Sequence, residues 1–148
     1  MQDAPLTLLS ISLQRFKQVN DNFGRTVGDQ LLVAIAQRLE LCLRDQDLLG
    51  RHTGDEFSVL LNGDLPQRED IDQLCRQLVE HMERPFPVAE QEVSLSLRIG
   101  IAQAPLDASS AHQLLRCADI ALYQARSSKH SGWCFFTREM ELRISDEQ

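Results

Sequence analysis

Two adjacent acids, Asp55 and Glu56, lie in the segment RHTGDEF between two apolar runs. The runs Leu48–His52 and Phe57–Leu61 are short and are separated by four residues, which is typical of a β-hairpin. Carboxylates placed side by side on a tight turn repel one another, and hard oxygen ligands of this kind suit magnesium. The pair is therefore compatible with a divalent metal site, but Asp and Glu are also ordinary residues of an exposed turn, and the hairpin alone favours that simpler interpretation.

The spacing of apolar residues predicts the elements that position these acids. A strand over Leu6–Leu13 precedes a short helical turn ended by Gly24, and a helix is expected to begin at Gly28–Asp29. After the hairpin, the pattern predicts a helix, an alternating strand, a helix opened by a capping box and a last strand. Their expected bounds are Ile71–Met82, Val93–Ile101, Ser110–Ala125 and Trp133–Phe136. This order of elements predicts an α+β fold, a mainly antiparallel sheet with helices packed on it.

The composition limits the classes of function. The chain has 148 residues, 43% hydrophobic and 25% charged, which suits one soluble globular domain. The net charge of -7 argues against a DNA-binding surface but permits a compact nucleotide, which needs only a few local cations. There is no apolar run of membrane-spanning length and no secretion signal at the start. We therefore expect a cytoplasmic domain without DNA or membrane contacts.

The cysteines do not form a metal motif. Cys42, Cys75, Cys117 and Cys134 are scattered, and none belongs to a C-x-x-C pair. Three of them lie in segments with apolar periodicity, so we expect buried free thiols in a reducing compartment rather than a zinc site.

Four segments together resemble the GGDEF family of diguanylate cyclases. They are RFKQVNDNFGRTVGDQLL, RDQDLLGRHTGDEFSVLL, LRIGIA and LLRCADIALYQARSSKHSGW. The resemblance runs from about Leu6 to Phe136 in the family's order, and it implies the ferredoxin-like, nucleotidyl-cyclase palm form of the α+β class. It also implies a chemistry in which two subunits each bring one GTP to a shared interface. There, Mg²⁺ or Mn²⁺ would help the 3′-hydroxyl of one GTP attack the α-phosphate of the other.

The resemblance assigns roles to residues on the hairpin and around it. Asp55 matches the family's hairpin metal ligand, and Glu56 matches the acid implicated in catalysis. The nucleotide-binding positions are matched by Phe16, Lys17, Asn20, Asp29, Gly54 and Arg126. Among these, Asn20 and Asp29 match the pair that hydrogen-bonds guanine, whereas Lys17 and Arg126 match phosphate-binding cations.

A second site is implied by the segment RDQD. Arg44 and Asp47 match the family's R-x-x-D site, at which an arginine binds the product, cyclic di-GMP. The same two residues could instead form a local ion pair at the end of a helix.

The first strand departs from the family pattern. In an active member this strand normally ends in D-x-D, but here Ser12 and Gln14 occupy the two acid positions. Ser12 and Leu13 thus stand where the other metal ligands would be, and a serine hydroxyl is a neutral and weak ligand. Loss of a unit charge beside a cation costs on the order of 4 kcal/mol at about 4 Å and an effective dielectric constant of about 20.

Two further departures affect the ends of the site. Thr53 replaces the first glycine of the signature, and its branched side chain disfavours a positive φ and crowds an approaching nucleotide. Lys129–Ser131 replaces the usual G-R-N, which weakens contacts to phosphate.

We therefore expect residues 1–137 to form a degenerate GGDEF domain, weak or inactive as a cyclase, that regulates by binding GTP or cyclic di-GMP. Mg²⁺ or Mn²⁺ is the expected cofactor if a metal binds at all. Two alternatives remain open: an active diguanylate cyclase, and a ligand-free dimerisation or scaffold domain. Residues 138–148 are expected to begin a helical linker, because FFTREMELR resembles the seam of GGDEF–EAL tandem proteins. The expected protein partners are an EAL phosphodiesterase domain and a second copy of the chain.

Overall fold

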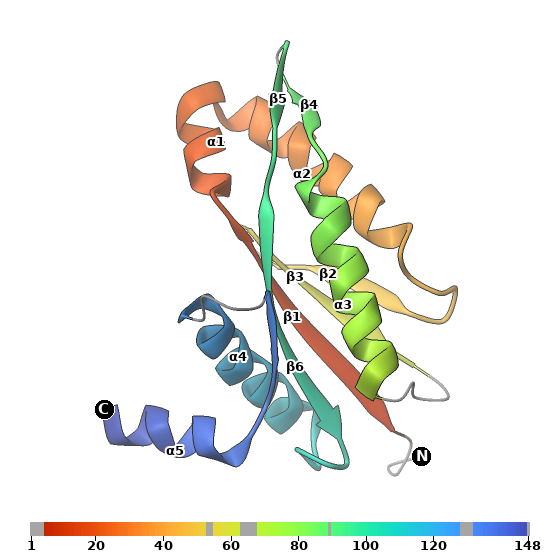
Figure 1. The fold of residues 1–148 in the computed structure, drawn as a ribbon, viewed down its shortest axis with the longest axis vertical. Helices are drawn as coiled ribbons and strands as arrows, with labels where there is room; N and C mark the ends of the chain where they lie inside the picture. The colour runs from red at the N-terminus through yellow and green to blue at the C-terminus, as the bar shows by residue number, and fades with distance from the viewer. Residues whose placement is uncertain (1–4, 53–54, 63–67, 89, 128–131, 148) are drawn as a thin grey trace.

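The computed structural model describes residues 5–52, 55–62, 68–88, 90–127 and 132–147. Its main sheet has the strand order β2-β3-β1-β6-β7 (Figure 1). The strands are β1 (Leu6–Gln14), β2 (Leu48–Arg51), β3 (Glu56–Leu61), β6 (Ser96–Ala104) and β7 (Trp133–Phe135). β1 lies at the centre and is antiparallel to β3 and β6, whereas β6 and β7 are parallel. The mainly antiparallel α+β architecture predicted from the sequence is confirmed.

Five helices are described. They are α1 (Phe16–Phe23), α2 (Arg25–Glu40), α3 (Arg68–Glu83), α4 (Ala111–Ser127) and α5 (Arg138–Glu147). α1 lies beyond one end of the long strands and α5 lies near the other end (Figure 1). None of the described helices is long and apolar enough to cross a membrane.

Alternation along β1 divides the hydrophobic residues between the two faces of the sheet. On one face, Leu9, Ile11 and Leu13 are at most 2% exposed and pack in one cluster with the apolar sides of α2 and α3. On the other face, Ala102 of β6 packs with Ala118 and other small residues of α4. Successive side chains of a strand point to opposite faces, so Ser10 and Ser12 lie on the face that α4 covers.

A glycine sets the distance between α4 and the sheet. A side chain at Gly100 of β6 would collide with the backbone of Ala118 and Leu122. The helix therefore rests directly on the strand, because no side chain separates them. This close contact holds the C-terminal end of α4 over the end of β1.

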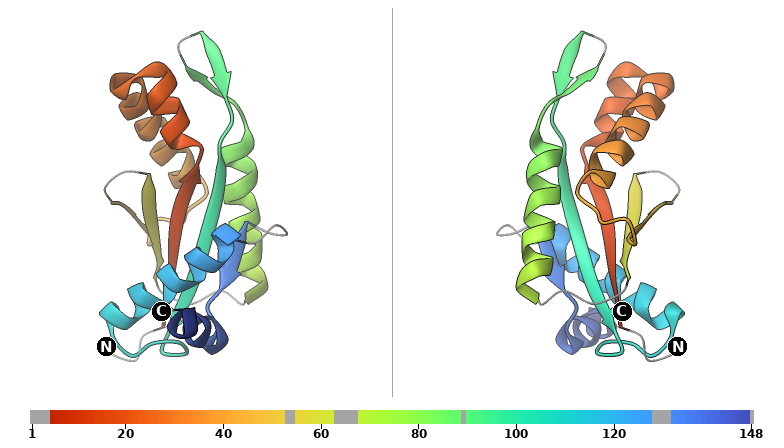
Figure 2. Two further views of the ribbon diagram at one scale, coloured as in Figure 1. Left: turned by 90° about the vertical axis from the view of Figure 1, so that its left-hand side faces the viewer. Right: turned by 90° about the vertical axis from the view of Figure 1, so that its right-hand side faces the viewer.

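Two of the predicted boundaries were wrong. α2 begins at Arg25, not at Gly28–Asp29, because Gly24 with φ 91° both ends α1 and precedes α2. The strand predicted over Val93–Ile101 is divided into two strands. Val93 ends β5 (Gln91–Val93), which pairs with β4 (Phe86–Val88) in a separate hairpin that projects past the sheet (Figure 2).

The predicted capping box at α4 is formed with one difference. Ser110 Oγ accepts a hydrogen bond from the Gln113 amide N–H at 3.1 Å, as a capping serine should. The Gln113 side chain reaches back to Ser109, whose N–H donates to Gln113 Oε1 at 3.1 Å, instead of to Ser110.

The four cysteines are free thiols. Cys75 and Cys117 are buried, whereas Cys42 and Cys134 are half-buried. Burial raises the pKa of the Cys117 thiol, and the nearby carboxylates of Asp107 and Glu141 raise it further. The thiol form is therefore favoured, as expected for a cysteine that packs rather than reacts.

Candidate nucleotide site

The centre of the candidate site is an arginine that joins two strands. Ser12 of β1 lies opposite Glu56 of β3 on one side and opposite Arg98 of β6 on the other. Residues paired in this way present their side chains to the same face of the sheet. Arg126, near the end of α4, donates from Nη2 to Glu56 Oε2 at 2.9 Å and to Ser12 Oγ at 3.1 Å. One guanidinium thus binds both the residue that matches the catalytic acid and the residue that replaces the lost acid.

Exposure differs among these three side chains. Ser12 is only 4% exposed, whereas the side chains of Arg126 and Glu56 are 42% and 43% exposed. The ion pair is therefore open to solvent, and its contribution to stability is small, about 0–1 kcal/mol. The ion pair matters because it places the positive charge of Arg126 beside Glu56 and Ser12.

Asp55 lies beside this arrangement at the end of the hairpin. Its backbone oxygen accepts a hydrogen bond from the Leu13 N–H at 3.0 Å, which ties the end of β1 to the turn. Thr53 and Gly54, the other residues of the signature turn, lie outside the described residues. In the part of the chain that is described, no group of three or more His, Cys, Asp or Glu side chains could hold a metal ion.

The start of α1 offers backbone donors next to the site. Arg15 joins β1 to α1 with φ 71°, and no side chain caps the first turn of the helix within the described residues. The first N–H groups of a helix have no partner within it, and they suit phosphate oxygens. Lys17, in this first turn, is exposed, whereas the Phe16 side chain is buried in the core and only 5% exposed. Phe16 can therefore contribute its backbone, but not its ring, to a bound nucleotide.

The predicted guanine-binding residues lie on neighbouring helices. The amide of Asn20 on α1 occupies the space that a side chain at Gly28 of α2 would fill. Asp29 is the next residue of α2 and is exposed. Gly28 thus allows Asn20 to lie against α2 directly beside the residue with which it is predicted to act.

The predicted product site is a closed ion pair at the other end of the hairpin. Arg44 Nη2 lies 2.8 Å from Asp47 Oδ1, and the Arg44 N–H donates to Asp47 Oδ2 at 2.9 Å. Arg44 also donates to the Asn62 oxygen at 3.1 Å, after β3. Burial alone would raise the pKa of Asp47, but the hydrogen bonds and charge of Arg44 outweigh burial and hold this pKa below its ordinary value. The pair therefore fixes the turn between α2 and β2, as the local alternative predicted.

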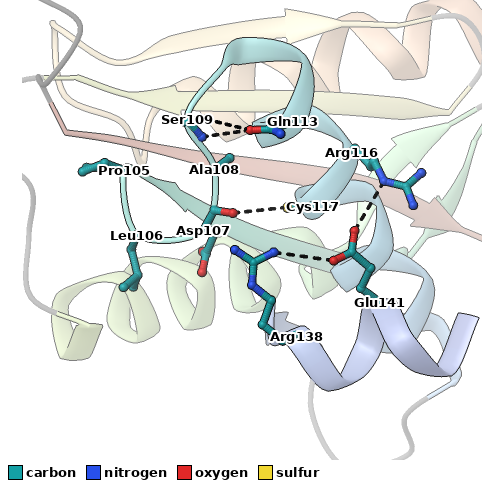
Figure 3. A pocket seen from close by; sticks show the side chains of 10 residues that line it. All are labelled: Pro105, Leu106, Asp107, Ala108, Ser109, Gln113, Arg116, Cys117, Arg138 and Glu141. Carbon is teal, nitrogen blue, oxygen red and sulfur yellow. Dashed lines mark hydrogen bonds and ion pairs between the residues drawn. The ribbon is translucent and has the colours of Figure 1, made fainter. Parts of the chain in front are cut away.

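Sequence reasoning missed two features of the α4 face. Ser10 donates to Asp119 Oδ1 of α4 at 2.8 Å, so an acid faces the serines of β1 from the helix and not from the strand. Two buried serines at alternate positions of an apolar strand were the available signal. The second feature is a polar cavity of about 340 Å³ between the β6–α4 loop, α4 and α5, where Glu141 pairs with Arg116 and Arg138 (Figure 3). None of the predicted site residues lines it.

Comparison of the sequence with models of known protein families identifies the family of this chain. The model of the family described as diguanylate cyclase, GGDEF domain, matches residues 1–131. The chain belongs to the GGDEF family. The resemblance inferred from the four sequence segments is therefore confirmed. Lys129–Ser131, the last departure from the pattern, lies outside the described residues.

Relatives of this GGDEF domain are larger proteins. MucR of Pseudomonas aeruginosa, a bifunctional diguanylate cyclase/cyclic di-GMP phosphodiesterase, is 35% identical over 145 residues, which cover 98% of this chain and 21% of MucR. NbdA of the same organism, a cyclic di-GMP phosphodiesterase, is 32% identical over 142 residues, which cover 96% and 18%. The chain spans about a fifth of the length of these curated relatives.

A solved structure confirms the arrangement of the elements. The crystal structure of the GGDEF domain of YfiN, also named TpbB, from Pseudomonas aeruginosa has a TM-score of 0.82 and 37% sequence identity to this chain. The match covers 90% of this chain and 83% of that one.

Proposed function

We propose that this GGDEF domain is a regulatory GTP-binding module of cyclic di-GMP signalling, weak or inactive as a diguanylate cyclase. The contact of Arg126 with both Ser12 and Glu56 carries the proposal. A cyclase needs carboxylates among its metal ligands and needs its acid to be available, because phosphoryl transfer depends on positioning and on neutralising developing charge. Here a serine stands at one ligand position, and a guanidinium binds the acid.

The parts of the site that recognise the nucleotide support GTP as the ligand. Asn20 and Asp29 keep the amide and the carboxylate that can together read the O6 acceptor and the N1 and N2 donors of guanine. Lys17 and the start of α1, which no described side chain caps, supply positive charge and N–H donors for phosphate groups. The domain thus retains recognition groups while lacking part of the reaction machinery.

The activity test uses the isolated domain with GTP and either Mg²⁺ or Mn²⁺, and the product is followed by chromatography. We expect little or no cyclic di-GMP in either metal. Turnover comparable to that of an intact GGDEF domain overturns the inactive assignment. The second candidate, an active cyclase, is favoured by the retained Asp55 and Glu56 and by the name of MucR. It requires that cyclic di-GMP formation depend on the metal and disappear in Glu56→Gln.

Calorimetry separates the binding module from a ligand-free scaffold. We expect heat of binding when GTP is titrated into the domain. Cyclic di-GMP is the second ligand to be titrated, with Arg44 and Asp47 as its candidate site. Absence of heat with both nucleotides contradicts the binding proposal and favours the scaffold.

We propose that the regulated partner is a phosphodiesterase domain of the EAL type, which residues 138–148 connect to the GGDEF domain of residues 1–137. The names of MucR and NbdA, both of which include cyclic di-GMP phosphodiesterase, support this arrangement. In the full-length protein, addition of GTP should change the rate of cyclic di-GMP hydrolysis. An Asn20→Ala variant should lose that response while keeping the basal rate.

A further inference from the structure

We infer that Arg126 takes the place of a divalent cation in this site, so that the domain binds the phosphate groups of GTP without Mg²⁺ or Mn²⁺. The inference rests on the proposed GTP-binding function and adds the cation on which binding depends. It comes from a disagreement between the family's metal site and the side chains that surround Ser12 in this chain.

The position of the guanidinium is the first observation. Arg126 Nη2 lies within hydrogen-bonding distance of both Glu56 Oε2 and Ser12 Oγ, at 2.9 and 3.1 Å. A divalent cation bound by Asp55 and Ser12 would gain only a neutral hydroxyl from Ser12, and it would lie close to the guanidinium that binds Ser12 and Glu56, the neighbour of Asp55. The guanidinium therefore already provides the positive charge that the family takes from a metal.

The local charge balance is the second observation. Asp55 and Glu56 bring two negative charges to the end of β1. Arg98, paired in register with Ser12, and Arg126 bring two positive charges, so these four side chains sum to zero. The carboxylate of Asp119 also lies on this face, but it accepts a hydrogen bond from Ser10 at 2.8 Å. Hard cations bind where several carboxylates converge, whereas the two acids at the end of β1 are matched by two arginines, an arrangement that suits an anion such as a triphosphate.

The chemistry of the guanidinium is the third observation. It carries five N–H donors in a rigid plane, stays charged at any relevant pH, and binds phosphate oxygens in pairs. Within the described residues, the polar contacts of Arg126 run through Nη2. No described residue accepts a hydrogen bond from Nη1 or Nε, so these atoms can donate to phosphate oxygens while Nη2 stays on Glu56. The Arg126 guanidinium can therefore bind Glu56 of the hairpin and a phosphate group of the nucleotide at the same time.

The test measures GTP affinity in two buffers, one with EDTA and one with excess Mg²⁺, by titration calorimetry on the intact chain. We expect the two dissociation constants to agree within about threefold, because the metal contributes little. Arg126→Gln should weaken binding about 10- to 100-fold in EDTA, as expected for loss of charge-assisted hydrogen bonds. Arg116→Gln is the matched control, since it removes the same charge from the same helix at a residue that pairs with Glu141. It should bind GTP like the native chain.

A second variant reverses the proposed substitution. In Ser12→Asp a carboxylate lies opposite Glu56, binds Arg126, and restores an excess of negative charge. Its GTP affinity should fall about tenfold in EDTA and recover when Mg²⁺ is added. Thermal unfolding of each variant without ligand shows that a loss of binding is not a loss of fold.

The outcomes separate the inference from the proposed function. Binding of GTP to the native chain only when Mg²⁺ is present overturns the role of Arg126 and leaves the regulatory GTP site intact. Equal affinities in both buffers, with native affinity in a folded Arg126→Gln variant, also overturn that role. Absence of binding in both buffers overturns the proposed function and this inference with it.

Discussion

Replacement of Gly28 by alanine tests whether Asn20 must lie against α2 to recognise guanine. The new methyl group would overlap the Asn20 amide, which must then rotate away from its position beside Asp29. The clash involves the end of a flexible side chain and not backbone, so the helix itself need not move. Gly28 lies inside α2, where alanine is the better helix former by about 1 kcal/mol. We therefore expect the free energy of unfolding to change by less than about 1 kcal/mol, because the gain in helix propensity offsets the rearrangement of Asn20.

The expected effect on binding is larger than the effect on stability. A neutral hydrogen bond contributes about 1 kcal/mol, and its loss leaves a guanine donor or acceptor without a partner. GTP affinity should fall about tenfold, whereas any affinity for ATP should stay the same. The assay is titration calorimetry with GTP and ATP, together with urea unfolding of the same samples.

A double-mutant cycle supplies the control. Asn20→Ala should weaken GTP binding as much as Gly28→Ala does, and the double variant should show no further loss, because both changes remove one interaction. In the Asn20→Ala background the clash is gone, so Gly28→Ala should stabilise the domain by about 0.5–1 kcal/mol. Native GTP affinity in Gly28→Ala, or additive losses in the double variant, would refute the assignment of Asn20 to guanine.

Four other changes have defined outcomes. Ser12→Asp combined with Gln14→Asp should raise metal-dependent formation of cyclic di-GMP above that of the native chain, and silence of both proteins in the chromatographic assay contradicts the lost-ligand explanation. Arg44→Ala should remove any affinity for cyclic di-GMP and leave a folded domain, as calorimetry and circular dichroism will show; unchanged affinity refutes that site. Because the pKa of Asp47 is lowered in the folded state, the stability it contributes is complete above the ordinary carboxyl pKa of about 3.9 and is lost as the pH falls through the lower folded value. Between about pH 5 and pH 2, urea unfolding should therefore show that the free energy of unfolding falls less steeply with decreasing pH in Asp47→Asn than in the native chain. Gly100→Ala should destabilise the domain by about 3 kcal/mol, since the methyl group meets the backbone of α4 and not a flexible side chain; a change below about 1 kcal/mol would disprove the direct helix–strand contact.

Local patterns in the sequence predicted most of the helices and strands. An element with one buried face places its apolar residues at a regular spacing, and this spacing can be recognised within a short segment. The alternation in Ser96–Ala104 and the apolar spacing of α3 are of this kind. The break between Val93 and Ser96 could not be predicted, since the alternation continues across two strands that belong to different sheets. The start of α2 was placed too late because Gly28 resembles a helix boundary, whereas it is a site of close packing inside the helix.

In the candidate site too, features carried by short motifs could be predicted, whereas contacts between residues far apart in the sequence could not. The hairpin acids and the missing acid of the first strand are visible in short motifs. The contact between Arg126 and Ser12 joins residues separated by 114 positions, and it depends on the crossing of α4 over Gly100. The sequence motif assigned Arg126 to phosphate, but only the packed helix shows that its charge also lies on Glu56. Asp119 was missed for the same reason, since nothing near Ser10 in sequence indicates its partner.

The bare contact of α4 with the sheet has a mechanical consequence. Arg126 lies beyond Gly100 toward one end of the helix, and Arg116, which holds Glu141 of α5, lies toward the other. The two arginines are about 15 Å apart along the helix axis, at 1.5 Å per residue. Because no side chain separates α4 from β6 at Gly100, a rotation of the whole helix about this contact would move the two arginines in opposite directions. A displacement of Arg126 would then be accompanied by a displacement of Arg116 and of its ion pair with α5.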